Sequence, residues 1–318
     1  MSVIIDPEMQ EILDEIRANP APDPRSLPIA EARAGFERSH APWNEPRTQV
    51  GSVADLSIPG DGSRVPARLY QPVGSPPFPV VVFAHGGGWT FGSLDSHDGL
   101  CRHLTRQSGC AVLAVDYRLA PEHPFPAPND DVVSAIRFVR SGGLSRLVDP
   151  HAIGAAGDSS GANLVLSALI SLRDTGEAAV SAAALIYGCY APDFDTESQK
   201  RHGDGSLPLT TEGLRWLWGN FLGGAAKNPD PLAAPLAADL AGLPPLYLSA
   251  AGLDPLLDDT LQLSRRLAAA GVSHRFDFFP GVTHGFLRMG KRLNAARVGI
   301  QRIAGFFAER LRQTEATA

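Results

Sequence analysis

The chain has 318 residues, of which 44% are hydrophobic and 19% charged, and its formal net charge is −6. This length and apolar content predict one domain with a large buried core, with room for a small cap. The mildly negative charge argues against nucleic acid or an anionic membrane surface as the main partner.

The cysteines and the first residues exclude further classes of protein. Cys101, Cys110 and Cys189 are too few and too scattered for a disulfide framework or a zinc site, so we expect reduced thiols and no metal. Residues 1–8 lack a basic segment followed by an apolar run, so we expect no signal peptide. No apolar run is long enough to span a bilayer. These features predict a cytoplasmic protein with no membrane partner.

The first fifty residues differ from the rest and are predicted to form a helical cap segment, residues 1–50. Apolar residues at helical spacing occur over Pro7–Ala18 and again over about Leu27–His40. The proline-rich stretch Pro20–Pro24 separates them. Such a segment cannot supply sheet strands, so we expect it to lie over another part of the protein.

From residue 51 to residue 318 the pattern is that of an α/β catalytic domain. Two extended stretches, Val50–Ile58 and Arg64–Tyr70, are joined by turn residues and predict an edge hairpin. Apolar runs then alternate with helical stretches, which predicts a mostly parallel sheet with helices on both faces. The strands are expected at Val80–Ala84, Ala111–Val115, Ile153–Ala156, Ala182–Ile186, Leu246–Ala250 and Arg275–Phe279, and the helices at Ser96–Gln107, Asn129–Arg140, Gly161–Arg173, Leu256–Ala270 and Asn294–Leu311.

An insertion at about residues 190–235 interrupts this alternation. It has no predicted strand but contains a polar loop and a helical stretch, Thr211–Leu222, that carries Trp216 and Trp218. Open parallel sheets bind ligands beyond the carboxyl ends of their strands. We therefore expect the insertion and the N-terminal segment to cover those strand ends as a cap.

The stretch Gly157–Gly161, with the sequence Gly-Asp-Ser-Ser-Gly, lies between a predicted strand and a predicted helix. A strand, a G-x-S-x-G sequence and a helix in this order are typical of a nucleophile elbow, in which the serine sits on a sharp, strained turn. Glycines on either side leave the space that such a turn needs. Ser159 is therefore the predicted nucleophile.

Three consecutive glycines, Gly86–Gly88, follow the predicted strand Val80–Ala84. Glycines allow backbone N–H groups to turn toward one point. Beside a nucleophilic serine they predict an oxyanion hole formed by the N–H groups of Gly87, Gly88 and Ser160. We interpret His85, which precedes the glycines, as a side chain that braces the loop and not as a base.

An aspartate and a histidine follow the last two predicted strands. Asp254 can orient a histidine and stabilise its charged form, and it can also cap the helix that follows. His284, on a glycine-flanked loop, is the predicted general base. The chain order Ser159, Asp254, His284 is that of α/β-hydrolases. Three other titratable residues are less well placed: Asp258, Asp259 and His274.

Together these motifs resemble the bacterial hormone-sensitive-lipase-like esterases, in the family IV branch whose elbow begins Gly-Asp-Ser. The resemblance extends from about residue 50 to the C-terminus. It implies an α/β-hydrolase fold, hydrolysis of carboxylic esters with short to medium acyl chains, no cofactor, and often a homodimer through the last strand. It also implies that Asp116–Ala127 is a structural brace. The matching motifs are His85–Trp89, Asp116–Ala127, Gly157–Gly161, Asp254–Leu256 and His284–Phe286.

One position departs from the family, because Ser160-Gly161-Ala162 stands where Ala-Gly-Gly is more usual. The backbone N–H of Ser160 is unaffected by this change, so the predicted oxyanion role stands. Four aromatic residues are predicted to lie at the substrate site, although the two in the insertion fit the core of the cap equally well. They are Trp89, Phe286, Trp216 and Trp218.

Two other functions stay open at this stage. A ligand-binding protein on the same scaffold, as in the plant gibberellin receptors, would lack the base, and the presence of His284 opposes it. Amide or lactone hydrolysis would use the same residues, because these reactions also pass through a tetrahedral oxyanion. The sequence predicts a serine carboxylesterase that acts on a small-molecule ester through an acyl-enzyme.

Overall fold

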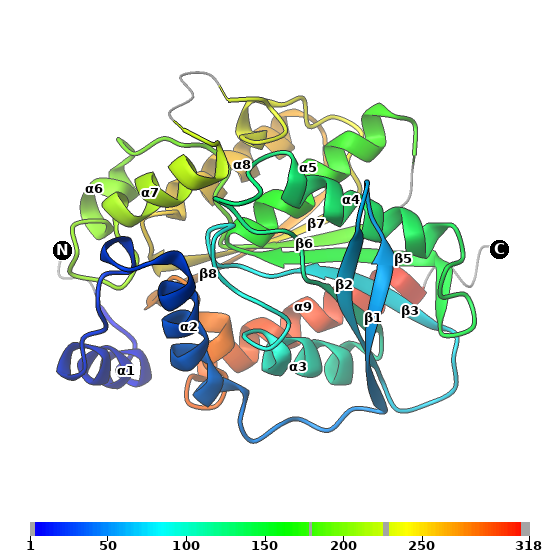
Figure 1. The fold of residues 1–318 in the computed structure, drawn as a ribbon, viewed down its shortest axis with the longest axis horizontal. Coiled ribbons are helices and arrows are strands. Elements are labelled where there is room, and N and C mark those ends of the chain that lie inside the picture. Colours follow the sequence, from blue (N-terminus) through cyan, green and yellow to red (C-terminus); the bar gives the residue numbers. More distant parts are fainter. Residues whose placement is uncertain (1–3, 178–179, 225–228, 313–318) are drawn as a thin grey trace.

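The computed structural model describes residues 4–177, 180–224 and 229–312 of the chain. An eight-stranded sheet forms its centre, and helices cover both faces (Figure 1). The strand order is β1-β2-β4-β3-β5-β6-β7-β8. The strands are β1 Ser52–Pro59, β2 Arg64–Gln71, β3 Phe78–Ala84, β4 Ala111–Val115, β5 Val148–Asp158, β6 Ala182–Ile186, β7 Leu246–Leu253 and β8 His274–Thr283.

The predicted mixture of parallel and antiparallel pairing is confirmed. β1 and β2 form an antiparallel hairpin at one edge, and β2 also pairs antiparallel with β4. All later neighbours pair in parallel, with β8 at the opposite edge. The central strands read as continuous apolar runs because both of their faces are buried under helices.

Each face of the sheet is covered by its own hydrophobic cluster. On one face β3, β5 and β7 pack against α4 and α5, with α8 beside them. On the other face α3 and α9 pack against the remaining side chains of the same strands. The helices are α3 Asp98–Ser108, α4 Ala127–Arg140, α5 Ser160–Asp174, α8 Leu257–Ala269 and α9 Asn294–Arg312.

The N-terminal segment forms two helices, α1 Pro7–Ala18 and α2 Ile29–His40. Asp6 caps α1 by accepting hydrogen bonds from two backbone N–H groups in its first turn. Its own N–H donates to Gly281 O at 2.9 Å, which attaches α1 to the end of β8. On α2, Arg33 donates to the carbonyl oxygens of Thr90 and Ala120 and pairs with Glu122. The segment is thereby fixed across the carboxyl ends of the strands.

The insertion contains α7, Thr211–Phe221, as predicted, and a short helix, α6 Glu197–His202, that the sequence analysis missed. Two carboxylates of α8 hold its first part: Asp258 accepts from Ser198 N at 2.9 Å and Asp259 from Tyr190 N at 2.6 Å. In Figure 1, α6 and α7 lie at the same end of the sheet as α1 and α2, toward the left of the view. The two predicted cap segments therefore lie over the same strand ends.

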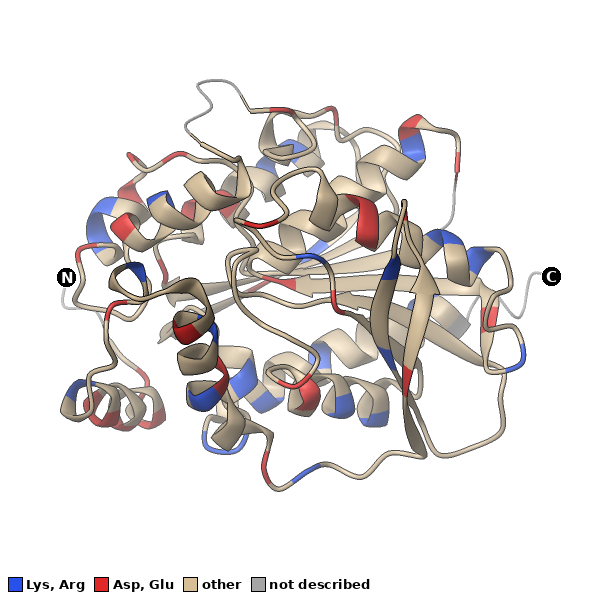
Figure 2. Cartoon of the chain, in the orientation of Figure 1, with Lys and Arg blue, Asp and Glu red and all other residues tan. Residues whose placement is uncertain are grey.

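The charge distribution, the helix hydropathy and the grouping of possible metal ligands complete the description of the fold. Figure 2 shows basic and acidic residues interspersed along the outer helices of the described chain. None of the described helices is both long enough and apolar enough to cross a bilayer. Across the described ranges, no three His, Cys, Asp or Glu side chains are grouped so as to hold a metal ion.

Candidate active site

Ser159 lies at the turn between β5 and α5, in a backbone conformation that side chains rarely adopt. Its φ is 55° and its ψ is −121°. A Cβ atom at Gly157 would overlap the carbonyl of Gly161, and one at Gly161 would overlap the carbonyl of Ala84. Such a turn costs on the order of 1–3 kcal/mol, which the packed strand and helix on either side offset. It lifts Ser159 Oγ out of the sheet and into a cavity.

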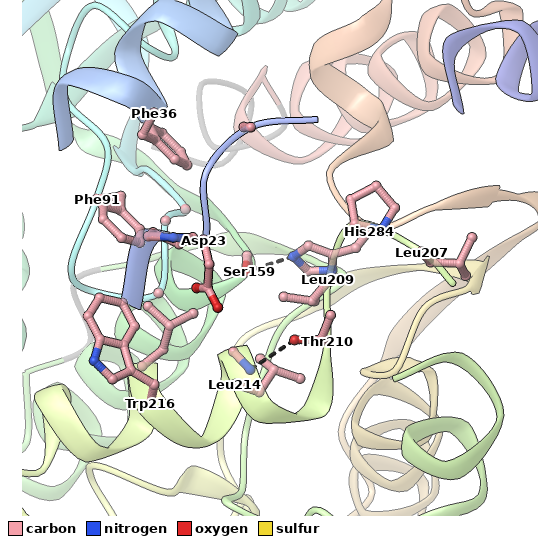
Figure 3. A pocket seen from close by; sticks show the side chains of 18 of the residues that line it. Asp23, Phe36, Phe91, Ser159, Leu207, Leu209, Thr210, Leu214, Trp216 and His284 are labelled. Carbon is pink, nitrogen blue, oxygen red and sulfur yellow. Dashed lines mark hydrogen bonds between the residues drawn. The ribbon is translucent and has the colours of Figure 1, made fainter. Parts of the chain in front are cut away.

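The structure brings Ser159, His284 and Asp254 together from three strand ends. His284 Nε2 lies 2.9 Å from Ser159 Oγ, and His284 Nδ1 lies 2.7 Å from Asp254 Oδ2 (Figure 3 draws the first contact). The Asp254 side chain is 1% exposed and that of His284 14%. A proton can therefore pass from the serine to a histidine that a buried carboxylate orients.

Asp254 has a second contact that fixes its carboxylate. Its Oδ1 accepts a hydrogen bond from Leu256 N at 2.8 Å. Helix α8 begins at Leu257, and its N-cap position is Leu256. The alternative in which Asp254 caps this helix is therefore wrong, because the aspartate stands two residues too early.

The glycine loop after β3 has the conformation that converging N–H groups require. The φ values of Gly87 and Gly88 are 125° and 61°, and a Cβ atom at Gly87 would overlap the carbonyl of Phe91. Both glycines line the cavity that contains Ser159. Their N–H groups have no acceptor among the residues that the structure describes. Ser160 begins α5, so its N–H also lacks an intrahelical acceptor.

Asp158 connects the elbow to the glycine loop, a role that the sequence analysis missed although the residue stands within the elbow motif. Its Oδ1 accepts from Gly86 N at 2.8 Å and lies 3.2 Å from His97 Nε2. Burial raises the pKa of this carboxyl, but the charge of His97 and the hydrogen bonds outweigh burial and lower the pKa overall. The charged carboxylate thus holds Gly86 in place.

His85 lies beneath the same loop. Its ring is buried and stacks on Tyr117, and burial lowers its pKa to about 3, so the ring is neutral at physiological pH. Its Nδ1 lies 2.8 Å from Gly86 O, and the Tyr117 hydroxyl donates to His85 O at 2.7 Å. These contacts agree with our interpretation of His85 as a brace.

A cavity of about 610 Å³ opens above Ser159. Its walls come from the glycine loop, from Ser159 and His284, from the N-terminal segment and from the insertion. Figure 3 shows Phe36, Phe91 and Trp216 along one side and Leu207, Leu209 and Leu214 along another. The ring of Phe91 lies 5.5 Å from that of Phe36 and 5.8 Å from that of Trp216. The site is therefore a largely apolar chamber with a few polar groups.

Two of the four predicted aromatic residues do not line this cavity. Trp218 is 2% exposed, and its ring packs 4.6 Å from that of Trp89 inside the cap. Phe286 is fully buried against Phe279 and Tyr187, beneath the His284 loop. Both predictions are wrong because the helical turns that carry these rings direct them into the core. Trp216 lines the cavity, as predicted. Trp89 borders it only as part of the glycine loop, because its ring is fully buried against those of Phe221 and Trp218.

The sequence analysis also missed the residues that the cap supplies to the cavity. Phe36, Asp23 and the leucines of the insertion follow no motif, and nothing in their spacing shows that they face the triad. Tyr187, whose ring lies 4.9 Å from that of His284, was missed for the same reason.

Comparison with known proteins agrees with this fold. A family model described as the alpha/beta hydrolase fold matches residues 81–288. The chain is 37% identical over 244 residues to the carboxylic ester hydrolase LipN of Mycobacterium tuberculosis, a match that covers 74% of the chain and 65% of LipN. It is 34% identical over 281 residues to an ethyl acetate hydrolase of Pseudomonas putida, covering 86% of the chain and 88% of that protein.

A solved structure is similar over nearly the whole chain. The esterase of Pyrobaculum calidifontis superposes with a TM-score of 0.91 at 32% identity, covering 96% of this chain and 98% of that one. The likeness therefore includes the N-terminal segment and the insertion as well as the sheet.

Proposed function

The chain belongs to the α/β-hydrolase family, in its hormone-sensitive-lipase-like branch, and we propose that it is a serine carboxylesterase whose triad is Ser159, Asp254 and His284. The observation that carries the proposal is the position of His284, within hydrogen-bond distance of both the serine and the buried aspartate. This arrangement also argues against a ligand-binding protein that lacks the base.

In the proposed reaction the cavity binds an ester with its carbonyl above Ser159. Ser159 Oγ attacks the carbonyl carbon while His284 Nε2 takes its proton. The N–H groups of Gly87, Gly88 and Ser160 stabilise the oxyanion, and Asp254 stabilises the imidazolium. His284 then protonates the departing alcohol, which leaves an acyl-enzyme.

Water completes the cycle. His284 removes a proton from a water molecule, which attacks the acyl carbon, and the same proton returns to Ser159 as the carboxylic acid departs. Every proton moved in these steps is carried by His284 Nε2. The reaction thus needs ester, water and the protein's own groups, in line with the absence of a cofactor implied by the family resemblance.

The size of the cavity supports esters with short to medium acyl chains. A chamber of about 610 Å³ walled by leucines and aromatic rings suits small apolar groups. We assign the cap role to residues 1–50 and about 190–235, which supply most of these walls. A panel of p-nitrophenyl esters of increasing acyl length measures the preference, and kcat/KM is expected to fall sharply for long chains.

Two further parts of the proposal concern the state of the protein in the cell. We propose a homodimer through β8, the edge strand, on which Phe278 is 48% exposed. Light scattering of the purified protein tests it, and a monomer at micromolar concentration contradicts it. The cytoplasmic location stays a prediction, which cell fractionation tests.

The test of the esterase function uses p-nitrophenyl butyrate and the Ser159→Ala variant. The wild-type protein should release p-nitrophenol, and the variant should fold normally but lose about five to six powers of ten in kcat, the scale for removing a triad nucleophile. A variant that keeps a tenth of the activity would show that the nucleophile lies elsewhere. Comparing ester, amide and lactone substrates separates esterase activity from related acyl hydrolysis.

A further inference from the structure

Arg288 is a cationic side chain on the wall of the active-site cavity that the proposed reaction does not use. It lies on the short 3₁₀ helix Phe286–Met289, four residues after His284. Its Nε and Nη1 are shielded from solvent and find no hydrogen-bond acceptor in the described part of the chain. A buried guanidinium whose N–H groups lack acceptors is costly, so its presence beside a nucleophile calls for a ligand.

The other two arginines of the cavity wall are already paired. Arg17 lies 3.0 Å from Asp14, and Arg25 lies 2.7 Å from Asp23 with a second donor on the same carboxylate. The carboxylate of Asp23, which Figure 3 shows at the cavity, is therefore neutralised by its neighbour. Within the described residues, Arg288 is the arginine of this wall for which no counter-ion is found.

The surroundings of Arg288 leave room for its head group but do not supply an anion. Its guanidinium carbon lies 5.9 Å from the centre of the Phe36 ring, a cation–π distance. A Cβ atom at Gly285 would come within 2.6 Å of Nη2, so the absence of a side chain there accommodates the guanidinium. Burial lowers the pKa of Arg288 to about 10, which leaves it charged at neutral pH.

We propose that Arg288 binds a carboxylate carried by the substrate, so that the preferred substrates are esters with a free carboxylate. The proposal rests on the proposed esterase function. The planar fork of a guanidinium matches a carboxylate in two parallel hydrogen bonds. A single unpaired guanidinium balances a singly charged carboxylate better than a doubly charged phosphate. The rings of Phe36, Phe91 and Trp216 would hold the apolar part of the same molecule.

Such a carboxylate can come from either half of the ester. A monoester of a dicarboxylic acid carries it on the acyl side, and an acyl ester of a hydroxy acid carries it on the alcohol side. The chemistry at Arg288 is the same in both, so the test compares the two sources. The acyl arm uses monoethyl glutarate, and the alcohol arm uses 4-acetoxybutanoate. Each is paired with its neutral primary amide.

The experiment measures kcat/KM for each pair by pH-stat titration at neutral pH. The wild-type enzyme should prefer the carboxylate over the amide by about tenfold to a hundredfold in at least one arm, the scale of a charged hydrogen-bonded pair. In Arg288→Met the ratio should fall toward one, and in Arg288→Lys part of it should remain. Arg17→Met removes a paired arginine of the same wall and should keep the ratio within about twofold.

The outcomes are distinguishable from those of the esterase proposal. If the wild-type enzyme hydrolyses p-nitrophenyl butyrate but shows no carboxylate preference in either arm, the role of Arg288 is refuted and the esterase function stands. The same holds if the preference persists in Arg288→Met. If the wild-type enzyme hydrolyses no ester, the esterase proposal fails and this inference fails with it. A wild-type enzyme without the preference refutes the role of Arg288 even if a variant does not fold, and Arg288→Lys serves in place of Arg288→Met if the methionine variant does not fold.

Discussion

Replacing Asp254 with asparagine tests how the triad is oriented, because the structure dictates which way the new amide must face. Asp254 Oδ1 accepts from Leu256 N, so the amide oxygen of asparagine must take this position. Its NH₂ group then takes the place of Asp254 Oδ2, which lies 2.7 Å from His284 Nδ1, and points at that nitrogen. A donor at this position forces the tautomer with the proton on Nε2, which faces Ser159 and can no longer accept its proton.

The expected loss follows from this wrong tautomer and from the missing negative charge. In serine hydrolases this exchange lowers kcat by about 10⁴, equivalent to about 5 kcal/mol at 1.36 kcal/mol per tenfold change. The effect on folding should be small, because asparagine keeps the volume and the bond to Leu256 N. We expect the melting temperature to change by no more than a few degrees, since one charged hydrogen bond of about 1.5 kcal/mol is weakened.

The assay is steady-state hydrolysis of p-nitrophenyl butyrate by Asp254→Asn beside Asp258→Asn. Asp258 is a neighbouring carboxylate that accepts from Ser198 N and lies outside the triad. Asp258→Asn should stay within about threefold of the wild-type kcat. An Asp254→Asn enzyme that folds and keeps more than a tenth of kcat would refute the reasoning about the tautomer.

Two further predictions concern the loop beneath the oxyanion. Gly87→Ala should lower kcat by at least about a hundredfold, because a Cβ atom there overlaps the Phe91 carbonyl and displaces one donor. The same overlap, at a φ that favours glycine, should also lower the melting temperature, and a folded variant with unchanged kcat would remove Gly87 from the hole. Burial lowers the pKa of His85 to about 3 in the folded protein, whereas in the unfolded chain its pKa is about 6.5. Below about pH 6.5 the unfolded chain therefore binds a proton that the folded protein does not bind. Stability is therefore lost as the pH falls, by about 2 kcal/mol between pH 7 and pH 5. Urea denaturation of the wild-type protein and of His85→Phe at pH 7 and pH 5 measures this. Between these pH values the free energy of unfolding of His85→Phe should fall by about 2 kcal/mol less than that of the wild-type protein, and an equal fall in both would contradict this assignment.

The sequence predicted the sheet well because its strands are buried on both faces and read as continuous apolar runs. The strand ends were less predictable. β8 continues through Pro280 and Gly281 to Thr283, residues that the sequence analysis assigned to a loop. Thr283 pairs with Leu253 of β7, and Gly281 O accepts the N–H of Asp6 from the N-terminal segment. Such a tertiary contact leaves no local signal.

The proximity of Ser159, Asp254 and His284 could be predicted because each directly follows a strand and parallel strands end at one edge. The cavity walls could not. Trp216 and Trp218 are two positions apart on α7, so they point to nearly opposite sides of the helix, and the sequence does not show which side faces the cavity. The structure places Trp216 in the cavity and Trp218 in the cap core.

Arg288 is another residue of the cavity wall that could not be predicted from the sequence. An arginine four residues after the base reads in the sequence as an ordinary surface cation. In the structure its guanidinium is shielded on the cavity wall and lacks a carboxylate partner among the described residues, whereas Arg17 and Arg25 of the same wall pair with Asp14 and Asp23. Which arginines reach the cavity wall, and which of them lacks a carboxylate partner, is a property of the folded chain.

The most direct test of the account is covalent labelling of the nucleophile with diethyl p-nitrophenyl phosphate, followed by intact-protein and peptide mass spectrometry. The account predicts one diethylphosphoryl group per chain, on the peptide that contains Ser159, and no adduct on Ser159→Ala. An adduct on another residue, or a wild-type protein that stays unlabelled, would contradict it.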